Sequence, residues 1–183
     1  MNRTALFASL VVVAASTATS TAQTPSPYAG QEQRTIRALS DQEIGDLLEG
    51  RGMGLAKAAE LNSYPGPLHV LQLANQLGLS DAQRAASESL YTDMRERAQS
   101  AGRKIIEAER NLNEAFADDH IDRAILRSQI NAIAILWGEL RTIHLETHLA
   151  QRSLLRAEQI ARYDVLRGYR GNPTPHGGQR HGG

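Results

Sequence analysis

Two long amphipathic segments joined by a short polar turn constrain the fold of this chain most. In the first, small and apolar residues recur at alternating spacings of four and three, the period of a helix packed along a partner helix. These seam positions are Ser87, Tyr91, Met94, Ala98, Ala101, Ile105, Ala108, Leu112 and Ala115. The second segment carries a matching face of Leu126, Ile130, Ile133, Trp137, Leu140, His144 and Thr147. Because only a turn around residues 116–120 separates them, the pattern predicts an antiparallel helical hairpin.

Helix-start signals place shorter helices before the hairpin. Ser40 and Glu43 form a capping box ahead of one helix, and Ser80 and Gln83 form a second box that starts the long helix. Two further short helices are expected at about 55–62 and 68–77, around the turn Tyr64-Pro65-Gly66-Pro67. Asp119 or Asp122 is expected to cap the return helix.

The fold class predicted from these signals is all-α. No segment shows the alternating pattern of a β-strand. We expect an elongated antiparallel hairpin with additional short helices, and the long helix of about 35 residues should measure about 50 Å. Because a hairpin of this length is elongated, we also expect it to pair as a homodimer.

The two ends of the chain differ in composition from the middle. Residues 1–22 are typical of a cleavable export signal, with Arg3, an apolar run and a small-residue cleavage site; an uncleaved N-terminal anchor is the alternative. The pattern predicts a flexible linker over 23–34, a helical domain over 35–169 and a disordered Gly/His-rich tail over 170–183. No other segment is long and apolar enough to span a bilayer. The export signal leads us to expect a periplasmic protein.

Charge and cysteine content exclude several classes. The 20 basic and 20 acidic residues balance, and no basic stripe indicates a nucleic-acid partner. Cysteine is absent, so there is no disulfide framework, and any metal site must use His, Asp, Glu or Met. No nucleophile, base and acid form a recognisable set, and the sequence therefore predicts no enzyme.

A short box, Leu-x-x-x-Gln, occurs twice: Leu79 to Gln83 opens the long helix, and Leu155 to Gln159 follows the return helix. With the export signal and the hairpin, the two boxes resemble the Spy/CpxP family of periplasmic stress proteins and the related heavy-metal sensor and resistance proteins. The resemblance covers about residues 68–168. Those families have Thr at the second box position, where this chain has Ser80 and Arg156. Arginine has no hydroxyl to cap a helix, so a helix break at the second box stays an open question.

The resemblance implies one of two functions. The first is an ATP-independent chaperone of the envelope stress response, which holds unfolded clients on a helical surface and needs no cofactor. The alternative is a heavy-metal-binding sensor or resistance protein that uses His and carboxylate ligands. The resemblance also implies a dimer, with unfolded clients or a membrane stress sensor as partners. The chaperone is the leading expectation, because it requires only the helical surface.

His144 and His148 are the candidate metal ligands. Side chains four residues apart lie on one helix face and can share a Zn, Ni or Cu ion. The missing ligands are sought among His69, Glu88 and Met94. The alternative is that His144 continues the core face and His148 lies in solvent. Glu146 follows His144 by two residues, which does not fit the His-Glu-x-x-His motif of zinc proteases. Weak metal binding by His176 and His181 in the tail is a further alternative to a disordered tail.

Overall fold

The computed structural model describes residues 25–170. The expected signal peptide and the tail beyond Arg170 therefore lie outside the described residues. The chain divides into two units, residues 1–32 and residues 33–183, which are described separately. In the first, residues 25–32 form turns, with the Ala29 N–H donating to the Ser26 carbonyl at 2.9 Å. A short 3₁₀ helix, η1 (Gln31–Gln33), spans the boundary.

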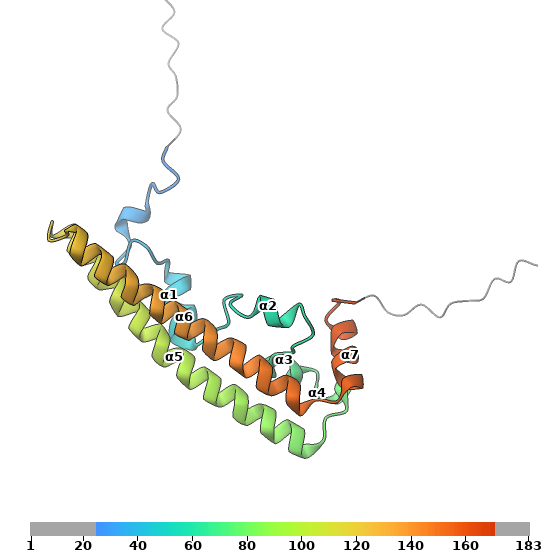
Figure 1. Cartoon of the computed structure of the whole chain (residues 1–183). Coiled ribbons are helices and arrows are strands. Elements are labelled where there is room, and N and C mark those ends of the chain that lie inside the picture. The colour runs from blue at the N-terminus through green and yellow to red at the C-terminus, as the bar shows by residue number, and fades with distance from the viewer. Residues whose placement is uncertain (1–24, 171–183) are drawn as a thin grey trace, which may run out of the picture. The chain divides into compact units, whose positions relative to one another are not determined.

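Seven α-helices make up the described part of the second unit, and no strand occurs within residues 25–170. They are α1 (Asp41–Glu49), α2 (Lys57–Glu60), α3 (Pro67–Gln72), α4 (Ala74–Leu77), α5 (Asp81–Ala117), α6 (Arg123–Leu154) and α7 (Ala157–Leu166). The all-α prediction is confirmed. In Figure 1, α5 and α6 run antiparallel as the predicted hairpin, and α1, α2 and α3 lie along it. None of the helices in the described range is long and apolar enough to cross a membrane.

The seam of the hairpin is buried where the sequence places it. Ala98 and Ile105 on α5 and Leu140 on α6 are at most 1% exposed. Towards the turn the packing loosens, and Ile130, predicted on the same face, is 46% exposed. Asp122 is the cap of α6, because its Oδ1 accepts the Ile125 N–H at 2.7 Å.

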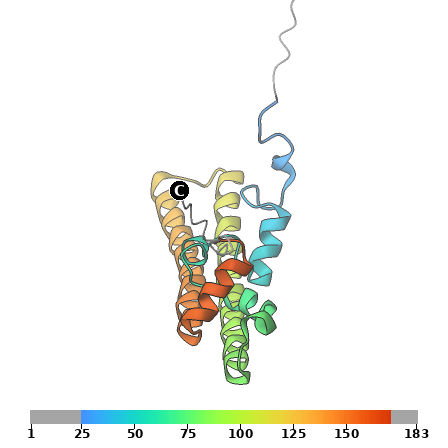
Figure 2. The same cartoon turned by 90° about the vertical axis from the view of Figure 1, so that its right-hand side faces the viewer.

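Helix α1 packs closely on the middle of α5, as Figure 2 shows from the side. The predicted capping box starts α1: Ser40 Oγ accepts the Glu43 N–H at 3.2 Å, and the Glu43 carboxylate accepts the Ser40 N–H at 2.8 Å. Leu47 of α1 is 1% exposed and belongs to the main core cluster. A Cβ at Gly102 of α5 would lie 2.3 Å from the Leu47 carbonyl oxygen, so only glycine permits this approach.

The short helices are shorter than predicted. The segment expected at about 55–62 is helical only over Lys57–Glu60, between left-handed residues at Gly54 (φ 76°) and Ser63 (φ 64°) that cannot continue an α-helix. The segment expected at 68–77 forms two helices, because Leu73 (φ −101°, ψ 12°) leaves the helical backbone conformation between them.

The chain does break at the second box. Leu155 is extended (φ −100°, ψ 146°), and α7 begins at Ala157. Gln159 supplies half of a capping box, since its Oε1 accepts the Arg156 N–H at 2.9 Å. The guanidinium of Arg156 has no acceptor for the other half. A second core cluster of Val70, Leu77, Leu155 and Tyr163 holds α7 in place.

Candidate functional site

The two Leu-x-x-x-Gln boxes pair with each other. The amide of Gln83 donates to Oε1 of Gln159 at 2.9 Å, and the amide of Gln159 donates back to Oε1 of Gln83 at 3.1 Å. Gln83 also donates to the Leu154 carbonyl, and Gln159 is only 2% exposed. Leu79 and Leu155 pack in the adjoining core cluster. Each glutamine thus caps its own helix and ties that helix to the other box, which is a structural function for the motif.

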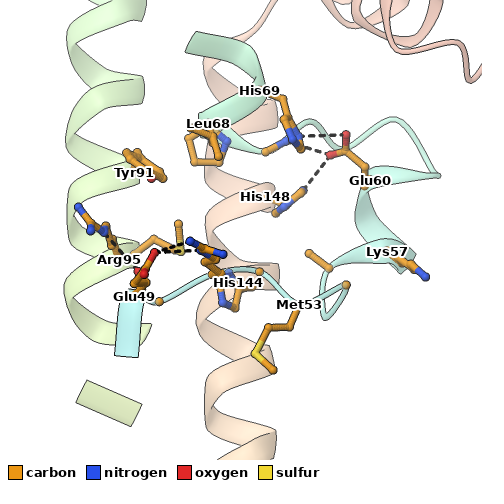
Figure 3. A pocket seen from close by; sticks show the side chains of 18 residues that line it. Glu49, Met53, Lys57, Glu60, Leu68, His69, Tyr91, Arg95, His144 and His148 are labelled. Atoms are coloured by element: carbon orange, nitrogen blue, oxygen red, sulfur yellow. Dashed lines mark hydrogen bonds and ion pairs between the residues drawn. The ribbon is translucent and has the colours of Figure 1, made fainter. Parts of the chain in front are cut away.

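Beyond this pair, the helices line a half-open cavity of about 650 Å³ (Figure 3). The size lies within the usual range of ligand pockets. One wall is formed by Glu49 at the end of α1 and by the α1–α2 loop that follows it, and the other by α5 and α6. Its lining includes Pro67 to His69, Tyr91, Met94, His144 and His148. The fold therefore brings both predicted ligands, and two of the three additional candidates, to one cavity.

His144 is the most unusual side chain of this cavity. It is 4% exposed, and no group in the described residues forms a hydrogen bond with its Nε2. Burial, followed by the nearby charge of His148, lowers the pKa of His144 to about 4. The imidazole is therefore neutral at pH 7, and its Nε2 is available as a ligand or hydrogen-bonding group. As the alternative sequence interpretation held, the ring also continues the core face of α6.

His148 is not in solvent but is fixed by its surroundings. Its Nδ1 lies 2.7 Å from the Tyr64 carbonyl and 3.8 Å from Oε2 of Glu60. Since a carbonyl only accepts, Nδ1 must carry a proton and donate it to this bond, so Nε2 is the ring nitrogen that faces other partners. A Cβ at Gly66 would lie 2.8 Å from this Nε2, so the ring packs directly against the glycine backbone.

Glu60 is the site residue that the sequence prediction missed. Its Oε1 accepts hydrogen bonds from Tyr163 at 2.5 Å and from Tyr169 at 3.0 Å, and His69 lies 3.6 Å away. Burial alone would raise the pKa of Glu60, but the nearby His69 and the hydrogen bonds from the two tyrosines outweigh burial and hold this pKa at about 2. Glu60 connects the cavity to α7. No local pattern signals this function, because Tyr163 lies 103 residues away in sequence.

The additional candidate ligands differ in position. His69 lies beside Glu60, and Met94 is buried in the cavity wall. Glu88 is exposed on α5 and does not line the cavity. Glu146 forms an ion pair with Arg97 at 3.2 Å and is exposed. Met53, which the sequence prediction did not single out, lines the cavity from the α1–α2 loop.

Within residues 25–170, no three His, Asp or Glu side chains are arranged to hold a metal ion together. The imidazoles of His144 and His148 line one cavity but are not joined there by a free carboxylate. No family model, curated protein or solved structure matches this chain. The chemistry of the cavity therefore has to be inferred from its own side chains.

Proposed function

We propose that this chain is an exported, non-enzymatic protein that binds a transition metal ion in the cavity between α5, α6 and the α1–α2 loop. The observation that supports this most is the Nε2 of His144, which is buried in the cavity wall without a hydrogen-bond partner in the described residues. A buried polar atom left without a partner costs roughly 1–3 kcal/mol. A ligand that accepts the imidazole lone pair would offset this cost.

The neutral imidazole of His144 and the orientation of His148 favour a metal ligand over an anion. His144 is neutral at pH 7, with a pKa of about 4. In His148, the bond from Nδ1 to the Tyr64 carbonyl orients the ring and leaves Nε2 to coordinate, an arrangement common among metal-binding histidines. The ion would be held by these nitrogens for capture or sensing, and no reaction is required of it.

A titration with metal ions tests this function. The two tail histidines, His176 and His181, are first replaced by alanine so that they do not contribute. We expect binding of Zn²⁺, Ni²⁺ or copper that His144→Ala removes. His120→Ala, in the exposed hairpin turn, is the matched control and should bind as before. Binding that is indifferent to His144, or no binding at all, would refute the proposal.

We propose an ATP-independent chaperone as the second candidate, as the resemblance to the Spy/CpxP family implies. It is supported by large apolar side chains that the hairpin leaves in solvent. Phe116, Ile130, Ile135 and Leu149 are 56%, 46%, 61% and 58% exposed. Apolar side chains that stay exposed on the folded protein are available to contact apolar segments of an unfolded client.

Suppression of client aggregation without ATP tests this candidate. The protein should reduce light scattering by several unrelated denatured clients, and Ile135→Ser combined with Ile130→Ser should weaken this effect. Ser128→Ala, exposed on the same helix, is the control. If no client is protected at either low or moderate salt, the chaperone function is excluded.

A further inference from the structure

The cavity concentrates the soft donor atoms of this chain. The sequence has three methionines, at positions 1, 53 and 94, and two of them, Met53 and Met94, line the cavity together with His144. Met94 is 7% exposed on α5, and Met53 extends from the α1–α2 loop. In Figure 3, Met53 and His144 lie at the same end of the cavity, away from Glu60. Thioether sulfur and imidazole nitrogen are ligands that monovalent copper prefers.

The backbone at Met53 is unusual for its residue type. Its φ is 45°, in the left-handed region that favours glycine, and it stands between Gly52 and Gly54. Side chains adopt this conformation at a cost that a glycine would avoid. The side chain of Met53 contacts the edge of the main core cluster, so part of this cost is offset by packing. The same conformation brings its thioether to the cavity that His144 lines.

The carboxylate oxygens that line the cavity already have hydrogen-bond or ion-pair partners. The carboxylate of Glu60 accepts hydrogen bonds from Tyr163 and Tyr169, and that of Glu49 forms an ion pair with Arg51 at 2.7 Å. These are the two acidic side chains in the lining. A divalent ion that requires carboxylate oxygen would have to break these contacts.

The charge of the lining also favours a monovalent ion. Three basic side chains, Arg51, Lys57 and Arg95, line the same cavity and outnumber the two acidic ones, Glu49 and Glu60. Coulomb repulsion is proportional to the charge of the ion, so a divalent cation is repelled twice as strongly as a monovalent one at the same position. Electrostatic repulsion by the lining is therefore weakest for a cation of single charge.

We infer that the cavity is a Cu(I) site, in which the sulfur atoms of Met53 and Met94 join the Nε2 atoms of His144 and His148 as ligands. This inference rests on the proposed metal-binding function and names its ion. Cu(I) is bound in the oxidation state in which it is supplied, and the protein transfers no electron to or from it.

Competition with a chromophoric Cu(I) chelator under anaerobic, reducing conditions measures the affinity. The protein carries His176→Ala and His181→Ala, and Zn²⁺ is titrated in parallel. Met53→Leu and Met94→Leu keep the side-chain size while removing sulfur. Each is expected to weaken Cu(I) binding by about tenfold or more, the effect of losing one good ligand. The affinity for Zn²⁺ should stay unchanged in both, and His120→Ala should alter neither ion.

A structural measurement keeps the test valid if a leucine variant folds poorly. X-ray absorption at the copper edge of the unsubstituted protein should show sulfur neighbours, and a spectrum with nitrogen and oxygen alone would overturn the inference. Cu(I) binding that depends on His144 but is equal in the leucine variants would also overturn it, leaving the metal-binding function intact. Absence of His144-dependent binding for Cu(I), Zn²⁺ and Ni²⁺ alike would overturn both.

Discussion

Replacement of Gly102 by alanine should destabilise the protein, although it lies inside a long helix. In a solvent-exposed helix interior, Gly→Ala raises stability by about 1 kcal/mol. Here the new Cβ would lie 2.3 Å from the carbonyl oxygen and 2.8 Å from the carbonyl carbon of Leu47. Carbon and oxygen in ordinary contact are about 3.3–3.6 Å apart. Helix α1 must therefore move by about 1 Å or detach.

The size of the loss follows from these two outcomes. Overpacking that shifts backbone costs about 1–3 kcal/mol. Detachment of α1 would expose Leu47, which is 1% exposed, and burial of a leucine contributes about 1.5–3 kcal/mol. After the helix-propensity gain of about 1 kcal/mol is subtracted, we expect a net loss of about 1 kcal/mol, with an upper limit of about 2 kcal/mol. Since α1 leads into the loop that forms one cavity wall, metal binding should weaken as well.

Urea unfolding followed by circular dichroism at 222 nm measures this effect. Gly138→Ala is the matched control, because Gly138 lies inside α6 and a Cβ there meets nothing within 4 Å. The control should gain up to about 1 kcal/mol, so the two variants should shift the midpoint in opposite directions. If Gly102→Ala is as stabilising as Gly138→Ala, α1 does not pack on α5 as described.

Three other predictions concern the boxes, the titrating groups and the cavity. Gln159→Ala should cost about 1–3 kcal/mol by leaving buried amide and carbonyl groups unpaired, and hydrogen exchange of α7 should show the helix opening first. The free energy of unfolding should fall by about 3 kcal/mol as pH drops from 6.5 to 4, because the folded state keeps His144 neutral with a pKa of about 4. The free energy of unfolding should fall again from about pH 4.5 towards 2, because Glu60, whose folded pKa is about 2, is then protonated. Urea midpoints measured against pH should show both decreases. His144→Phe should remove the first decrease and Glu60→Gln the second. Gly66→Ala places a methyl group 2.8 Å from the Nε2 of His148, so titration should show metal affinity reduced about tenfold or more while the helical signal is kept.

The sequence by itself placed the two long helices and the starts of α1, α5 and α6. Capping at Ser40, Ser80 and Asp122 depends on groups three residues apart, and such local chemistry can be read without knowledge of the fold. The alternating apolar spacing likewise predicted the hairpin and its buried face, since the helical period alone places those side chains together. The pairing of His144 and His148 on one helix face follows from the same period.

The tertiary structure decided which residues pack against these helix faces. Helical periodicity specifies a direction around the axis but not how far one helix slides along another. The sequence therefore located both glutamine boxes without predicting that Gln83 and Gln159, 76 residues apart, bond to each other. The approach of Leu47 to Gly102 and the contacts of Glu60 with two tyrosines depend on the same docking. The cavity and its two methionines exist only because long-range packing brings the α1–α2 loop against α5 and α6, and no local signal encodes that packing.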